Sequence, residues 1–134
     1  MNKAYYNNFI ITASYTGSKC APWANGRENW NHHIVTVRNK ETGKRTSFDF
    51  WASIANPVLE TEYDIINAFY CFLSDAVSGE ESFEDFCADF GYDEDSRTAE
   101  RTWKACKRAA AKFQRIAPNE DLYDLINEVS ENYA

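Results

Sequence analysis

The segment from Ser82 to Arg115 constrains the fold of this chain more than any other. It reads SFEDFCADFGYDEDSRTAERTWKACKRAAAKFQR. Its second half predicts a long helix that begins near Asp95 or Ser96, because apolar residues recur at steps of four and three along one narrow seam. The seam consists of Ala99, Trp103, Cys106, Ala110, Phe113 and Ala117. Such a seam can pair with another helix of the same chain or of a second subunit.

A shorter helix is predicted immediately before the long one. Ser82 and Asp85 have the spacing of an N-cap and its reciprocal partner, and Gly91 fits a left-handed C-cap. Apolar residues follow at helical spacing over barely two turns, at Phe83, Phe86, Cys87 and Phe90. A helix of this length does not hold in isolation, so its phenylalanines must dock it onto the rest of the protein.

Two further helices flank this pair. Thr61 and Asp64 form a capping box that starts a helix running to about Val77, which Gly79 ends. Pro118 closes the long basic helix and precedes a last helix from Asn119 to about Glu131.

The N-terminal part of the chain has the alternation of β-strands. Strands are predicted over Tyr5–Thr16, Asn31–Asn39 and Arg45–Trp51, with Gly43 in the left-handed position of a hairpin turn. Alternation in the third strand places Asp49 and Trp51 on one face, opposite Phe48 and Phe50. The long loop between the first two strands, Gly17–Asn29, is polar and rich in glycine and proline.

These elements predict an α+β fold in a single domain of 134 residues. A three-stranded antiparallel meander occupies about residues 1–55, and three to four helices that pack against it occupy about residues 60–134. The content of 44% hydrophobic and 16% aromatic residues is that of a globular chain. We expect no signal peptide and no membrane span, because no long apolar run is present.

Charge is distributed unevenly along the chain. The net charge is −7, but residues 60–95 hold twelve acids and no base, while residues 97–115 hold seven bases and one acid. The bases of the long helix recur on one face at Arg101, Lys104, Arg108, Lys112 and Arg115. We interpret this stripe first as matched by acidic neighbours within the chain, second as a partner-binding face and last as a nucleic-acid contact.

Few residues suggest catalysis or metal binding. The neighbouring His32 and His33 point to opposite faces of a strand and so cannot readily chelate one ion. An EF-hand loop starting at Asp93 fails, because Thr98 and Lys104 stand where glycine and glutamate are needed. We therefore expect no metal, no cofactor and no enzymatic activity. The cysteines lack metal-ligand spacing, and Cys71, Cys87 and Cys106 are interpreted as core residues of a reduced, cytosolic protein.

The segment from Ser82 to Cys106 resembles a signature of small acidic accessory proteins of phages and mobile elements. The elements in order are F-E-D-F, F-G-Y-D-x-D-S-R and K-A-C, and FDFWAS and YDIINAFYCFLSDA upstream fit the same pattern. The resemblance covers about half of the chain. It implies an early phage accessory protein, and proteins that disarm host defence, including anti-CRISPR proteins, share this size and acidity.

From charge and resemblance together we expect a phage-derived, non-enzymatic inhibitor of a CRISPR–Cas effector in the host cytoplasm. The protein would be a monomer or a homodimer. It would bind the basic nucleic-acid groove of the effector, which is a host protein complex, and would itself contact neither nucleic acid nor membrane. The alternatives are an accessory protein that regulates host transcription or replication, and a small enzyme acting on nucleotides. The expected binding residues are acids and loop aromatics. They are Glu80, Glu81, Glu84, Asp89, Asp93, Glu94, Trp23 and Trp30.

Overall fold

The computed structural model describes residues 2–23, 26–53 and 58–133 of the chain. The chain forms two compact units, essentially Met1–Phe69 and Tyr70–Asn132, and the boundary between them falls inside a helix. The elements in order are β1 (Asn2–Tyr6), β2 (Phe9–Cys20), β3 (Asn29–Asn39), β4 (Arg45–Ser53), α1 (Glu62–Gly79), α2 (Phe83–Phe90), α3 (Arg97–Gln114), the 3-10 turn η1 (Asn119–Asp121) and α4 (Leu122–Tyr133).

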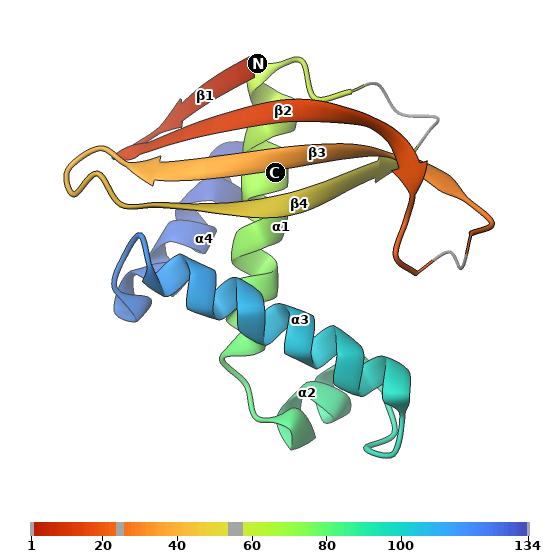
Figure 1. Ribbon diagram of the computed structural model, residues 1–134. Coiled ribbons are helices and arrows are strands. Elements are labelled where there is room, and N and C mark those ends of the chain that lie inside the picture. Colours follow the sequence, from red (N-terminus) through yellow and green to blue (C-terminus); the bar gives the residue numbers. More distant parts are fainter. Residues whose placement is uncertain (1, 24–25, 54–57, 134) are drawn as a thin grey trace. The chain divides into compact units, whose positions relative to one another are not determined.

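The α+β class is confirmed, but the sheet has four strands and not three. Its strands are antiparallel and lie side by side in the order β1-β2-β3-β4 (Figure 1). The predicted first strand Tyr5–Thr16 is interrupted by a tight turn, in which Asn7 adopts a left-handed conformation with φ 49°. Asparagine tolerates this conformation better than most residues, so the chain reverses between Tyr6 and Phe9 and adds an edge strand.

The loop predicted at Gly17–Asn29 is shorter than expected. β2 continues to Cys20, which pairs with Asn29 of β3, and the register shifts between Tyr15 and Gly17. Gly17 has a φ of 119° and lies at a β-bulge inside β2. The sequence had suggested that this glycine begins a loop. The connection between β2 and β3 is reduced to residues 21–28.

The sheet separates apolar from polar side chains onto two faces. The core face carries mostly buried residues from all four strands, namely Ala4, Tyr6, Phe9, Ile11, Ala13, His33, Val35, Val37, Thr46 and Ala52. The opposite face, here called the outer face, carries the residues between them, among them Thr12, Thr36 and Ser47. Thr36 and Ser47 share a hydrogen bond of 2.8 Å on that face.

The beginning of α1 belongs to the first unit. The predicted capping box is confirmed, because the Asp64 backbone N–H donates to Thr61 Oγ1 at 3.1 Å and the Thr61 N–H donates to Asp64 Oδ2 at 3.3 Å. Phe69 packs its ring 5.8 Å from that of Phe9, which attaches this part of α1 to the core face. Cys71 lies two residues further on and is exposed, so its prediction as a core residue was wrong.

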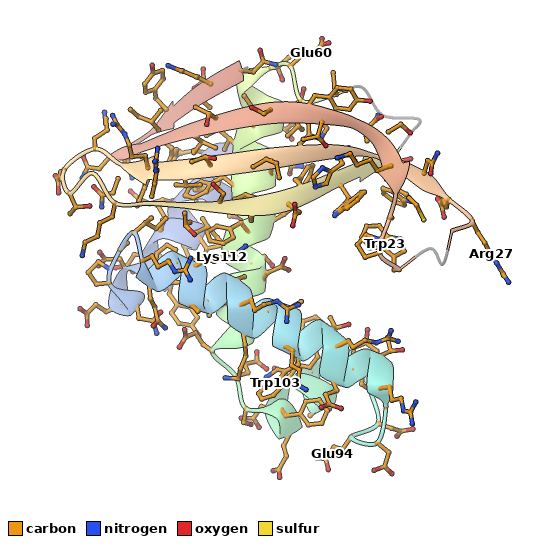
Figure 2. All side chains as sticks on the ribbon, viewed as in Figure 1. Trp23, Arg27, Glu60, Glu94, Trp103 and Lys112 are labelled. Carbon is orange, nitrogen blue, oxygen red and sulfur yellow. The ribbon has the colours of Figure 1, made fainter. Side chains whose placement is uncertain are left out.

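The second unit is held together around the joint between α1 and α2. Both predicted caps of α2 are present, with Ser82 accepting from the Asp85 N–H and Gly91 in the left-handed conformation. Trp103 of α3 points toward α2 (Figure 2), donates from Nε1 to the Glu81 carbonyl at 3.1 Å and packs on Phe83. Lys107 lies over the Trp103 ring and donates to the Gly79 carbonyl at 3.3 Å.

Gly79 makes the closest approach between these helices. A Cβ at this position would lie 2.1 Å from the Cys106 carbonyl oxygen, so α1 and α3 meet backbone to backbone at their crossing. Beside it, Phe86, Cys87, Ala99 and Cys106 form a buried cluster. The seam predicted for α3 is therefore confirmed as its packing face. Among the described residues, no helix is long and apolar enough to cross a membrane.

Candidate interaction surfaces

The acids of residues 80–95 form a surface on α2 and the turns that flank it, here called the acidic segment. Its members are Glu80, Glu81, Glu84, Asp85, Asp89, Asp93, Glu94 and Asp95. All are exposed except Glu81, which is half-buried. Among the residues that the structure describes, none of these acids forms an ion pair with a lysine or arginine. The negative charge of the acidic segment is thus left uncompensated.

Three of these carboxyl groups lie close enough to affect one another. A hydrogen bond that protonated Glu81 donates to the Asp89 carboxylate, together with burial and the charges of Asp89 and Asp85, raises the pKa of Glu81 above its ordinary value. Asp85 and Asp89 are one turn apart on α2, and Glu81 lies just before the N-cap of that helix within reach of both. A basic side chain placed there would meet several carboxylates at once and relieve their repulsion.

Of the predicted matching of the basic stripe by acidic neighbours, the described part of the chain shows one ion pair, and none with the acidic segment. The ion pair seen on α3 is Lys104 with Glu100, at 2.9 Å and within the same helix. Arg101, Arg108 and Arg115 are exposed. The acidic segment and the exposed arginines of the basic stripe therefore keep their charge for solvent or for a partner.

The two predicted tryptophans of the first unit belong to one aromatic cluster, formed by Trp23, Trp30, His32 and Trp51. The Trp23 ring lies 5.3 Å from that of Trp30 and 5.9 Å from that of Trp51, with edge-to-face geometry. Trp23 is 56% exposed at the loop between β2 and β3 (Figure 2). Trp30 is half-buried, and its Nε1 has no hydrogen-bond partner among the described residues.

His32 anchors this cluster through a chain of polar contacts. Its Nε2 donates to Asp49 Oδ1 at 2.8 Å, its Nδ1 contacts the Thr16 hydroxyl, and its ring lies 4.4 Å from that of Trp51. Both ring nitrogens are therefore occupied, which fixes the orientation of the ring. The alternation of β4 already placed Asp49 and Trp51 on one face. The contribution of Thr16 depended on the bulge and could not be predicted.

His33 points to the core face, as the strand alternation predicted. Its Nε2 accepts from the Leu59 backbone N–H at 3.2 Å, and its ring packs between Tyr15 and Phe50. Burial lowers the pKa of His33 below its ordinary value. No group of histidine, cysteine and carboxylate side chains within the described ranges could hold a metal ion.

Comparison of the chain with protein-family models, with curated proteins and with solved structures gave no match. The expected residues fall on two separate surfaces. The six acids belong to the acidic segment of the second unit, and Trp23 and Trp30 belong to the aromatic cluster of the first.

Proposed function

We propose that this protein acts by stoichiometric binding in the host cytoplasm, as a phage-derived inhibitor of a nucleic-acid-targeting defence complex. A CRISPR–Cas effector is the first candidate partner. The observation that carries the proposal is the uncompensated charge of the acidic segment, which has eight acids within sixteen residues and no base among them. A basic nucleic-acid groove is the protein surface that best complements such a charge.

Binding would use the neighbouring carboxyl groups of Glu81, Asp85 and Asp89. A lysine or arginine of the effector brought near Glu81 and Asp89 lowers the pKa of Glu81, because an opposite charge favours the ionised form. Complex formation then releases a proton, and its affinity rises with pH through the range in which Glu81 titrates. Nucleic acid and inhibitor compete for the same basic residues of the effector.

Aromatic anchoring is the second part of the proposal. Exposed tryptophans supply large apolar contact areas and recur as energetic hot spots in protein interfaces. Trp23 has this exposure, and its ring packs against that of Trp30 in the aromatic cluster. Regulators of host transcription or replication also bind basic grooves, so a polymerase subunit is the alternative partner.

The test compares two triple charge reversals in the full chain. Glu80→Lys, Glu81→Lys and Glu84→Lys change the acidic segment, whereas Glu120→Lys, Asp121→Lys and Asp124→Lys make the same change of net charge at the start of the last helix. Inhibition of target cleavage by purified effectors should be lost in the first variant and kept in the control. Equal inhibition by both variants would remove the acidic segment from the proposal. Copurification with a host polymerase subunit would favour the alternative.

A further inference from the structure

The sheet carries a charge opposite to that of the whole protein. Residues 1–53 contain seven lysines and arginines against three carboxylates, an excess of four positive charges in a chain whose net charge is −7. All seven bases are exposed. The expectation that the chain avoids nucleic acid rested on its total charge, which hides this reversal.

Register places four of these bases on the outer face, with Arg38, Arg45 and Lys3 toward one end of the sheet and Lys19 at the other. Directly opposed residues of antiparallel strands share a face. Arg38 pairs with Arg45, and Lys19 pairs with Trp30, so these three bases lie on the face that carries the aromatic cluster. Lys3 of β1 pairs with Thr12 and joins the same face.

Aromatic rings accompany the bases at both ends. Tyr5, which is 55% exposed, pairs with Ile10, and Ile10 pairs with Arg38, so the three lie in one row across the outer face. The aromatic cluster with Trp23 lies at the other end, beside Lys19. Trp30 and Arg38 are eight residues apart on β3, which corresponds to about 26 Å at about 3.3 Å per residue.

Between the two ends the outer face carries mainly small hydroxyl-bearing residues around one apolar side chain. Thr12, Ser14, Thr36 and Ser47 lie there with half-buried Ile34. The acid of this face is Asp49, and its carboxylate is engaged by His32. A ligand along the face therefore meets rings and positive charges at its ends and hydrogen-bonding groups in the middle.

We propose that the outer face of the sheet binds single-stranded nucleic acid. Bases stack on exposed Trp23 and Tyr5, while phosphates pair with Lys19, Arg38 and Arg45. Stacking on aromatic side chains combined with a cationic surface is how proteins bind single strands with little sequence preference, at sites of four or more nucleotides. This inference shares Trp23 with the anchoring part of the proposed function but none of its acids, which lie in the other unit.

The experiment measures fluorescence anisotropy of a labelled oligo-dT of about 15 nucleotides at about 50 mM salt, with the full chain. Trp23→Ala should weaken binding at least about fivefold, and Trp23→Phe should restore most of it, because one stacked base contributes that much. Arg38→Ala with Arg45→Ala should lower the slope of log affinity against log salt by about 1.4, the value for two phosphate contacts on a single strand.

The matched control removes two bases from the other unit, Arg101→Ala with Arg108→Ala, and should leave binding unchanged. Three results would overturn the proposal. They are no binding by the wild-type chain at low salt, equal losses in the Arg38/Arg45 and Arg101/Arg108 variants, and duplex DNA bound as tightly as the single strand. Stacking requires unpaired bases, so the last result would replace it with a simple charge effect.

Discussion

Replacing Gly79 with alanine tests the packing of the second unit. The new Cβ would lie 2.1 Å from the Cys106 carbonyl oxygen, 2.5 Å from its carbon and 2.9 Å from the Lys107 nitrogen, whereas ordinary contacts begin at 3.4 Å. The helices must therefore separate by about 1 Å, because all three of these atoms belong to the backbone and cannot rotate away. Overpacking of this kind costs about 3 kcal/mol.

The sign of the effect distinguishes this account from helix propensity alone. Alanine is favoured over glycine within a helix by up to about 1 kcal/mol, so an uncrowded Gly79→Ala would stabilise the protein. With the clash included we expect a net loss of about 2 kcal/mol in the free energy of unfolding. That loss lowers the melting temperature by roughly 6–10 °C for a chain of this size.

Urea unfolding followed by circular dichroism measures this loss, with Ser78→Ala as the matched control. Ser78 precedes Gly79 in α1 and is half-buried, and its change should stay within about 0.5 kcal/mol. If Gly79→Ala were as stable as the wild type or more so, the close crossing of α1 and α3 at Cys106 would be refuted.

Three other predictions follow from titrating and reactive groups. The pKa of Glu81 is raised in the folded protein, so the free energy of unfolding falls as the pH rises from 4.5, the ordinary pKa, through the pKa of the folded state. Glu81→Gln should remove this fall and raise the urea midpoint at neutral pH. The lowered pKa of His33 has the opposite effect: its contribution to the free energy of unfolding is fully present above pH 6.5, the ordinary pKa, and is lost as the pH falls below it. His33→Gln should reduce this loss of stability at acidic pH. Burial, with the charge of Asp75, raises the pKa of the Cys106 thiol to about 11. Alkylation of the native protein, followed by mass spectrometry, should therefore be fast at exposed Cys20 and slow at Cys106. Equal rates at the two cysteines would contradict the packing of α3.

Local signals in the sequence predicted the helices well. The Thr61–Asp64 box, the Ser82 cap and the Gly91 C-cap all form as expected, because each requires contacts only within a few residues. The packing face of α3 was also predictable, because the apolar residues of one helix recur at regular spacing along its sequence. Conversely, the contact of Gly79 with Cys106 and the bond from Trp103 to Glu81 join residues far apart in sequence, and no local pattern announces them.

The sheet was predicted less completely because its irregular positions carry weak signals. Asn7 turns the chain in the middle of an aromatic and β-branched run, without the glycine that usually marks a hairpin. Gly17 looked like the start of a loop but makes a bulge inside β2. These two positions decide which side chains reach the outer face. The sequence indicated Trp23 and Trp30 as separate anchors, and their meeting with Trp51 and His32 needed the register.

The central claim is that the acidic segment inhibits a defence effector by occupying its basic groove. The most direct measurement is a titration of target cleavage by a purified CRISPR–Cas effector, with nucleic-acid binding by the effector followed in the same samples. The account predicts that cleavage and nucleic-acid binding fall together, reaching an end point at a fixed ratio of inhibitor to effector. It also predicts that the Glu80/Glu81/Glu84 reversal abolishes both effects. Undiminished nucleic-acid binding at full occupancy of the effector would contradict it.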